Sequence, residues 1–259
     1  MSLRALLLLP GLLAAQSDPG FPTYTAAAVA HAATNSAGSY AANTLISIYG
    51  VNLSIGVQAI TAADIAGGNL PTYLGPLSTR VELDGQFASL YYASPTQINA
   101  LLPPNLLTGP HTLQIIANGR AGPAVRITFE ESAPGLFESD DHHVIATHGN
   151  GPVVSAAAPA QGGEVIVLYA TGLGPTNPPA VINRIASVAA KLVALPSFEV
   201  WINGTPVPAD RVQYAGLTPG FAGLYQINVR LPDAAPPDPE IRVGTPGRMS
   251  PPGRFLRFR

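Results

Sequence analysis

Hydrophobic and polar residues alternate with a period of two in short runs along this chain. In FEVWING (198–204), the apolar Phe198, Val200 and Ile202 occupy every second position, and YQINVRL (225–231) follows the same pattern. Because the side chains of a β-strand point alternately to opposite faces, each run predicts a strand with one face in a core. The pattern favours short strands of the kind that build a β-sandwich.

Turn signals and the lack of long helical patterns indicate the same fold class. Several runs end at dipeptides that favour tight hairpin turns: Asp84-Gly85, Asn118-Gly119 and Asn203-Gly204. No run of about twelve or more residues keeps a helical apolar period free of Gly and Pro. The nearest is 181–195, which is either a short helix or a loop with one turn. We therefore predict an all-β protein.

The predicted strands recur in the same order in the two halves of the chain. Four pairs of segments match: LISIYGVNL (45–53) with VIVLYATGLG (165–174), VELDG (81–85) with VWING (200–204), TQINALLP (96–103) with YQINVRLP (225–232), and LQIIANGR (113–120) with IRVGTPGR (241–248). The insertion LTPGFAG (217–223) lengthens the second copy before its Gln-Ile-Asn run. This order predicts an internal duplication, with one sandwich domain at 18–134 and a second at 135–259. The insertion is where the halves differ, which makes it the better place to look for whatever the second domain does alone.

The duplicated Gln-Ile-Asn run has a structural interpretation. Ile98 and Ile227 are expected in the two cores. The flanking amides lie on the opposite face, where they are expected to tie neighbouring loops to the sheet.

The first residues, MSLRALLLLPGLLAAQS, have the pattern of an export signal. Arg4 precedes an apolar run at 5–13 and then small residues, which predicts a signal peptide at 1–17, with cleavage after Ala15 as the competing position. The run is shorter than the ~20 apolar residues of a membrane span. We therefore expect an exported protein that is extracellular, on the cell surface or periplasmic. The chain has no cysteine, so its core alone must hold the fold.

The composition and charge limit the classes of binding partner that we expect. Charged residues make up 11% of the chain and the formal net charge is −2, which gives no general reason to expect nucleic acid or an anionic membrane. The tail GRFLRFR (253–259) is the local exception. It is interpreted as a charged last strand that resists edge pairing, with a binding patch as the alternative.

The sequence shows no catalytic arrangement. It contains no Gly-x-Ser-x-Gly elbow, and its five histidines form no established pattern with a nucleophile. We predict no catalytic residue, no cofactor and no enzyme activity.

The segment ESDDHHVIATHG (138–149) concentrates side chains that suit a divalent metal: Asp140, Asp141, His142, His143 and His148. Their spacing matches no established metal motif, and adjacent histidines in a strand point to opposite faces. A solvated loop is the favoured interpretation, and the five residues are only weak metal candidates.

Three aromatic residues are candidates for ligand binding. Trp201 lies on the polar face of its predicted strand, Tyr91 is adjacent to Tyr92 so that one of the two must face away from the core, and Phe221 is in the inserted loop. Exposed rings of this kind form platforms for ligands. For Trp201, cross-strand packing or cover from the loop at 174–196 is the alternative.

Long segments of the chain carry a resemblance to a known family: NSAGSYAANTLISIYGVNL (35–53), SAPGLF (132–137) and YAGLTPGFAGLYQINVRLP (214–232). They resemble an uncharacterised family of secreted bacterial proteins, abundant in Acidobacteria, in which the region is usually a C-terminal module behind a propeller or other repeat domain. The resemblance covers 28–248 and implies two tandem immunoglobulin-like domains of the IPT/TIG kind. It implies no activity, because a fold does not determine function. This chain departs from the family in its basic tail and in following the signal peptide directly.

These observations predict an exported, noncatalytic binding or spacer module whose ligand is a protein or a glycan. The alternative is a structural or assembly domain that pairs with a separately encoded partner, and a hydrolase or metal-dependent enzyme comes third. An exposed apolar patch would favour the binding module. An uncovered sheet edge would favour the assembly domain.

Overall fold

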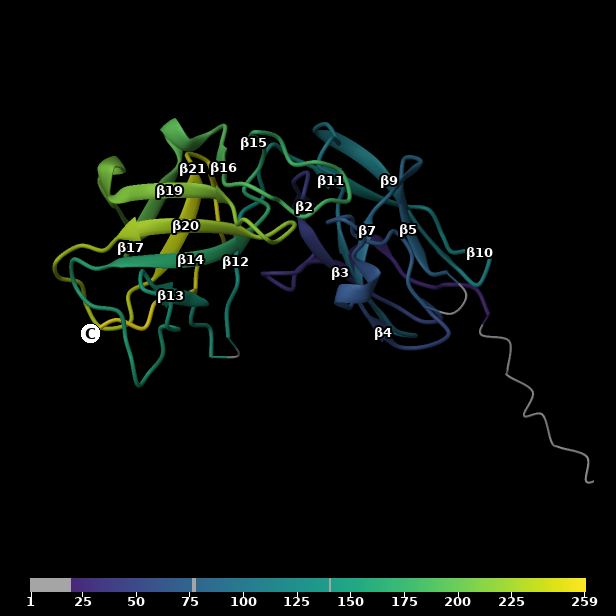
Figure 1. The fold of residues 1–259 in the computed structure, drawn as a ribbon, viewed down its shortest axis with the longest axis horizontal. Helices are drawn as coiled ribbons and strands as arrows, with labels where there is room; N and C mark the ends of the chain where they lie inside the picture. Colours follow the sequence, from purple (N-terminus) through teal and green to yellow (C-terminus); the bar gives the residue numbers. More distant parts are fainter. Residues whose placement is uncertain (1–19, 76–77, 140) are drawn as a thin grey trace, which may run out of the picture.

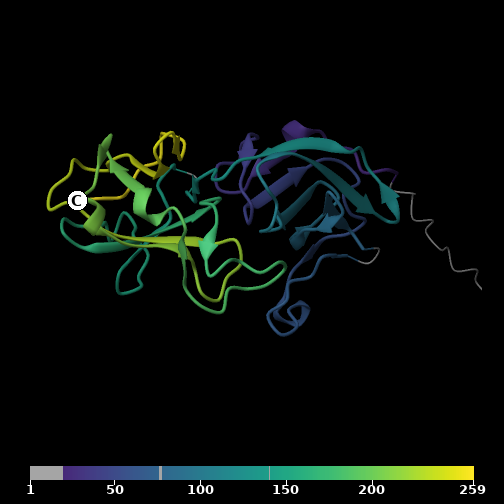
Figure 2. The same ribbon diagram turned by 90° about the horizontal axis from the view of Figure 1, so that it is seen from above.

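The computed structural model of the chain describes residues 20–75, 78–139 and 141–259. Within these residues there are twenty-two strands, four 3₁₀ helices of three residues each and no α-helix. The strands form four sheets, arranged as two β-sandwiches that lie side by side along the long axis of the molecule (Figure 1 and, seen from above, Figure 2). The prediction of an all-β protein with two tandem immunoglobulin-like sandwiches is confirmed. The predicted signal peptide, 1–17, and Asp140 lie outside the described residues.

The first sandwich pairs a five-stranded sheet with a six-stranded one. The five-stranded sheet has the order β1 (Val29–His31), β3 (Leu45–Tyr49), β8 (Gln97–Leu101), β7 (Ser89–Ala93), β4 (Gln58–Ala59). The other has the order β2 (Ser39–Tyr40), β11 (Val125–Phe129), β9 (Gly109–Ala117), β5 (Arg80–Leu83), β6 (Gln86–Phe87), with β10 (Arg120–Ala121) also pairing with β9. The 3₁₀ helices η1 (Ala26–Ala28) and η2 (Ala62–Asp64) lie in its connections.

The second sandwich repeats this strand order. Its larger sheet has the order β12 (Gly135–Leu136), β14 (Val165–Thr171), β20 (Tyr225–Arg230), β19 (Val212–Leu217), β16 (Ala190–Leu192), β15 (Thr176–Asn177), with β13 (Ala146–His148) also on β14. The smaller sheet has the order β18 (Thr205–Pro206), β17 (Glu199–Ile202), β21 (Ile241–Thr245), β22 (Arg248–Met249). Its 3₁₀ helices are η3 (Leu195–Ser197) and η4 (Ala209–Arg211). The domain limits 18–134 and 135–259, and the duplication itself, stay predictions.

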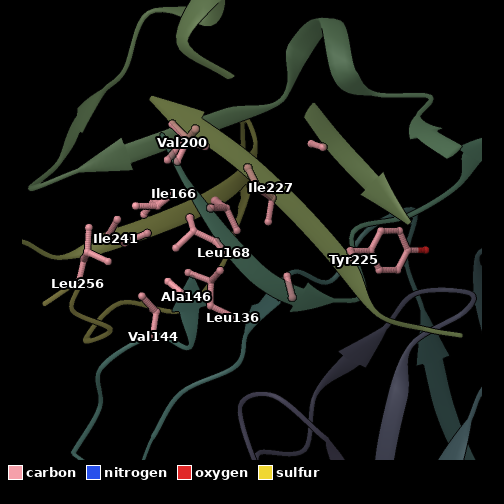
Figure 3. Packing of buried hydrophobic residues seen from close by; sticks show 14 of the residues in the cluster. Leu136, Val144, Ala146, Ile166, Leu168, Val200, Tyr225, Ile227, Ile241 and Leu256 are labelled. Carbon is pink, nitrogen blue, oxygen red and sulfur yellow. The ribbon is translucent and has the colours of Figure 1, made fainter. Parts of the chain in front are cut away.

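The alternating runs bury the faces that their apolar residues predicted. In β20, Tyr225, Ile227 and Val229 are buried while the residues between them are partly exposed. Figure 3 shows Ile227 packed with Leu168, Val200 and Ile166 between the two sheets of the second sandwich. Burial of branched aliphatic side chains from both sheets supplies the main stabilising term, because the chain has no cysteine.

The two Gln-Ile-Asn runs are core strands. Ile98 and Ile227 are fully buried, as predicted. Their flanking amides differ from the expectation that they tie loops to the sheet. Gln97 Nε2 donates to Asn99 Oδ1 at 2.8 Å, and Gln226 Nε2 donates to Asn228 Oδ1 at 3.1 Å. Residues i and i+2 of a strand lie on the same face, so the two amides satisfy each other along the strand.

Residues 254–258 complete the second sandwich as β11 completes the first. Phe255 bridges antiparallel to Glu240, and Phe258 bridges parallel to Ala160, while β11 pairs antiparallel with β9 and parallel with β2. Leu256 and Phe258 are buried in the second core. The buried apolar side chains of the basic tail therefore anchor it as an edge segment of the sheet.

The charges of this tail are paired with the acidic segment that precedes β13. Arg254 Nη2 lies 2.7 Å from Glu138 Oε1, and Arg257 forms an ion pair with Asp141. The Ser139 hydroxyl, followed by nearby His143 and Arg257, holds the pKa of Asp141 at about 2. Glu138 and Asp141 are thus partners of the tail within the fold.

Candidate functional site

A buried histidine packs at the joint between the two sandwiches and contacts both of them. His31, in β1, is 5% exposed, its Nε2 lies 3.0 Å from the carbonyl oxygen of Ala133, and its Nδ1 accepts a hydrogen bond from the Ala33 amide at 3.3 Å. This places the proton of the neutral ring on Nε2. Burial lowers the pKa of His31 to about 4, opposed by the bond to Ala133. The ring also packs against Gly135 and Gly172 of the second sandwich, where a Cβ atom would lie 2.3 Å and 2.9 Å from ring atoms.

Hydrogen bonds with buried side chains cross the joint beside His31. The Leu45 amide donates to Thr171 Oγ1 at 3.0 Å, and the same hydroxyl donates to the carbonyl of Gly223 at 2.7 Å. Asn43 Nδ2 donates to the hydroxyl of Tyr225 at 3.3 Å. Figure 3 shows the Tyr225 hydroxyl turned away from the core of the second sandwich and towards the first. Burial raises the pKa of Tyr225 to about 12, so this tyrosine remains a neutral donor.

Two loops of the second sandwich dock on the first. The loop between β15 and β16 reaches towards the first sandwich (Figure 1), and its backbone bonds to it: Leu70 N to Asn183 O at 2.8 Å and Ile185 N to Gly68 O at 3.0 Å. The loop that follows β19 contributes Ala222, whose carbonyl accepts from the Tyr91 hydroxyl at 3.0 Å. A small apolar cluster, separate from both cores, seals the contact: Leu70, Leu101 and Ala222, with Leu45, Ile60, Ile65, Tyr91 and Ile185 around them.

The insertion at 217–223 therefore does not serve the second domain alone. Gly223 approaches the first sandwich so closely that a Cβ atom would lie 2.4 Å from Leu101 Cδ1, and its φ of 70° suits glycine. The sequence comparison of the halves located the difference, but it contains no signal that the extra residues reach across to the other half.

A cleft of about 520 Å³ opens over this joint, which we call the joint cleft. Its walls are the two docked loops and the segment around Gly67 and Gly68. Three apolar side chains of the lining are more than half exposed: Val181 at 58%, Val188 at 56% and Phe221 at 55%. Next to the lining in sequence, the Thr218 hydroxyl is buried without a hydrogen bond to the described chain. Exposed apolar side chains gathered around a concave surface are typical of a binding site.

The three predicted ligand-binding aromatics occupy different settings. Phe221 lies in the wall of the joint cleft. Tyr91 is half-buried in the joint cluster beneath it, and burial raises its pKa to about 12. Trp201 lies in β17 of the second sandwich, where its Nε1 donates to Glu199 Oε2 at 2.8 Å. The structure thus brings Tyr91 and Phe221 to one place and leaves Trp201 on another sheet. It adds Val181 and Val188, which the sequence did not single out because loop valines carry no periodic signal.

The predicted metal candidates engage separate partners. His142 Nδ1 lies 3.2 Å from Glu138 Oε2, His143 lies 3.2 Å from Asp141 Oδ1 and 3.7 Å from Asp238 Oδ2, and His148 Nδ1 lies 2.9 Å from Glu164 Oε2. Glu164 raises the pKa of His148. Among residues 20–75, 78–139 and 141–259, no group of three or more His, Asp or Glu side chains converges as a metal site would require. Asp140 lies outside these ranges.

In two histidines, one ring nitrogen lies against a carboxylate and the other against a backbone carbonyl. His111 Nδ1 lies 2.6 Å from Asp84 Oδ2, and its Nε2 lies 2.8 Å from the carbonyl of Leu107. His148 has the same arrangement with Glu164 and the carbonyl of Ala158. A general base needs one ring nitrogen free to accept a proton from a nucleophile. These two histidines, and His31, have both ring nitrogens engaged.

Sheet edges are short throughout the described chain. Each sheet ends in strands of two or three residues, such as β4, β6, β15 and β18. Short edge strands offer few unpaired backbone groups to an incoming strand. The described residues also contain no helix of sufficient length and hydropathy to cross a membrane.

No protein-family model matches the sequence, and no curated protein matches it significantly. Among solved structures, the chain is similar to a surface glycan-binding protein, PbSGBP-B from Prevotella bryantii, with 14% identity over 89% of this chain and a TM-score of 0.27. It is also similar to the SGBP-B of the mixed-linkage glucan utilization locus of Bacteroides ovatus, with 11% identity over 95% of this chain and a TM-score of 0.33. Tandem Ig repeats of Dlar match with 12% identity over 84% of this chain and 90% of that chain, at a TM-score of 0.20.

The chain spans 41% and 44% of the lengths of the two SGBP-B proteins.

Proposed function

We propose that this chain is an exported, noncatalytic binding module in which two sandwiches form one body and hold a ligand in the joint cleft. The observation that carries the proposal is the gathering of Val181, Val188 and Phe221, each more than half exposed, around that cleft. Single exposed apolar residues are ordinary on a protein surface, but several of them around one hollow are typical of an interaction site.

The joint beneath the cleft supports the same function. Both walls are fixed by backbone hydrogen bonds between the sandwiches and by the apolar cluster around Leu70, Leu101 and Ala222. A site whose walls are already ordered loses less conformational entropy when its ligand binds. The contact therefore gives the two-sandwich unit a role that neither sandwich has alone.

The chemistry of the lining favours a protein ligand over a glycan. Among the described residues that line the joint cleft, apolar side chains dominate, Arg184 is the charged one and none carries a carboxylate. The Asn43 amide is already engaged with Tyr225. A sugar chain needs polar groups to replace the water around its hydroxyls. An extended peptide with apolar side chains fits the cleft better, and its acidic groups would meet Arg184.

Replacing Phe221 by Ala is expected to raise the dissociation constant for such peptides by about tenfold or more, because truncating a central aromatic anchor typically costs about 2 kcal/mol. The probes are extended peptides selected on the mature protein from a random displayed library. Binding is measured by interferometry for Phe221→Ala and for Val188→Ser. The matched control is Leu107→Ala, because Leu107 is 79% exposed and lies outside the cleft.

Three results distinguish the alternatives. Loss of affinity in both cleft variants but not in Leu107→Ala supports the proposal. Equal loss in the control contradicts the assignment to the cleft. If no peptide is selected and a glycan array binds through Phe221 instead, the peptide assignment is wrong while the cleft remains the site.

The assembly alternative has less support from the structure. Pairing with a partner by strand addition needs a long open edge, whereas the outermost described strands have two or three residues. A spacer function is compatible with the same rigid joint, and the peptide selection separates it from a binding module, because a spacer would yield no cleft-dependent ligand.

A further inference from the structure

The first sandwich places one arginine close to two aromatic rings on the outer face of its six-stranded sheet. The guanidinium carbon of Arg80 lies 5.7 Å from the ring centroid of Tyr73 and 5.3 Å from that of Phe87. Cation–π attraction acts over such distances. We call these three side chains the Arg80 platform.

Backbone register builds this arrangement. Phe87 in β6 lies opposite Glu82 in β5, and Arg80 lies two residues earlier on the same face of β5. Tyr73 directly precedes Leu74, and Arg80 directly follows Thr79. The backbones of Leu74 and Thr79 bond to each other in both directions, at 3.1 Å and 2.8 Å. These backbone pairings bring both rings close to Arg80.

The guanidinium of Arg80 makes no hydrogen bond or ion pair with any described residue, unlike Arg248, Arg254 and Arg257, which pair with carboxylates. Stacking on rings occupies the faces of a guanidinium and leaves the N–H groups at its edge available. That edge matches a carboxylate in a bidentate pair. The platform thus offers a site for an anionic group beside an aromatic surface.

Tyr73 indicates which anionic ligands fit. Tyr73 is 54% exposed, so this aromatic residue is accessible to solvent next to Arg80. The negative face of an aromatic ring attracts the slightly positive C–H groups of a pyranose. Glu82, on the same face of β5, can accept hydrogen bonds from sugar hydroxyls. A phosphate ion or an acidic peptide would use Arg80 but gain little from the tyrosine.

We propose that the Arg80 platform binds an acidic polysaccharide, with a uronic acid carboxylate on Arg80 and the sugar ring on Tyr73. The ligand chain lies along the outer face of the six-stranded sheet, which carries Arg80 and Phe87. The platform shares no residue with the joint cleft. It is a second site, and the function proposed for the cleft does not depend on it.

Affinity electrophoresis of the mature protein tests this site. The gels contain polygalacturonate or polyglucuronate, and parallel gels contain the methyl esters of both polymers, which keep the sugar rings and lose the charges. Both acids are expected to retard the protein and both esters to leave its mobility unchanged. Arg80→Gln and Tyr73→Ala are each expected to weaken the retardation by about tenfold.

Arg126→Gln is the matched control, because Arg126 is an exposed arginine of β11 on the same outer face, without a ring beside it. It and Phe221→Ala should bind the acids as the unmodified protein does, and circular dichroism checks that each variant is folded. The proposal is overturned if neither acid retards the protein, or if the esters retard it equally well. It is also overturned if Arg126→Gln weakens the retardation as much as Arg80→Gln does. Equal binding to polyglutamate of the same charge, unaffected by Tyr73→Ala, would also overturn it by showing attraction to charge alone.

Discussion

Replacing Leu256 by Ala is expected to lower the free energy of unfolding of the second sandwich by about 3 kcal/mol, because a fully buried leucine is lost and a cavity remains. Leu256 is 0% exposed and packs in the same cluster as Ile241 and Leu168 (Figure 3). Its neighbour Phe258 occupies the same core. Removing residues 254–259 deletes both side chains and the backbone bonds to Ile241 and Ala160, so the second sandwich should not fold.

Urea unfolding followed by tryptophan fluorescence measures this effect. The chain has a single tryptophan, Trp201, and it lies in the second sandwich. Phe255→Ala is the matched control, because Phe255 is the adjacent residue and is 37% exposed, so its loss should cost less than about 1 kcal/mol. Equal destabilisation by the two substitutions would contradict the assignment of 254–258 as the last core segment.

Acidification is expected to destabilise the joint through His31. The pKa of this histidine is about 4 in the folded protein and 6.5 as the unperturbed value, so the unfolded chain takes up the proton first. Protonation of His31 therefore does not change the free energy of unfolding above pH 6.5. It lowers that free energy progressively as the pH falls from 6.5 to 4. The loss reaches about 3 kcal/mol, since one pKa unit corresponds to about 1.4 kcal/mol. Protonation also removes the lone pair on Nδ1 that accepts the Ala33 amide.

The measurement is the difference in unfolding free energy between pH 7 and pH 4.5, compared for the unmodified protein and His31→Gln. Glutamine can donate to the Ala133 carbonyl but does not titrate, so the variant should lose less stability over this range. Carboxylates that titrate at the same pH contribute equally to both proteins and cancel. Identical pH dependence in the two proteins would show that His31 is not the buried neutral group described above. His111→Gln, at a site outside the joint, is the control.

Close packing at the joint also explains why the glycines near it cannot be replaced by larger residues. A Cβ atom at Gly172 would lie 2.2 Å from the carbonyl oxygen of Ala133, and this residue has a φ of 76°. Backbone cannot move aside as a flexible side chain can, so the restriction at Gly172 comes from the other sandwich as much as from its own turn. The sequence alone marks it only as a turn glycine.

The sequence predicted the strands well because their signal is local. Alternation in 198–204 and 225–231 identifies which side chains enter the cores, and Val200, Ile202 and Ile227 are buried accordingly. The Gln-Ile-Asn runs were interpreted correctly as core strands. The partners of their amides were not predicted, because an i, i+2 pair along one strand competes with loops that the sequence does not place.

The candidate site was only partly visible in the sequence. Phe221 was singled out because it lies in an insertion, and the structure places it in the joint cleft. Val181, Val188, Tyr73 and Arg80 were not singled out, since isolated valines, tyrosines and arginines in loops or strand ends have no distinctive spacing. The histidines at 142–148 attracted attention as neighbours in sequence. In the fold they engage separate carboxylates.

By itself, the sequence determined the all-β class, the two sandwiches in tandem and most of the core faces, because these follow from the two-residue period of a strand and from turn residues. Only the tertiary structure decided how the sandwiches meet, and with it the joint cleft. Contacts such as Tyr91 with Ala222 and Leu45 with Thr171 join residues more than a hundred positions apart. The free energy of such contacts depends on which surfaces face each other after folding, and a pattern of neighbouring residues does not contain that information.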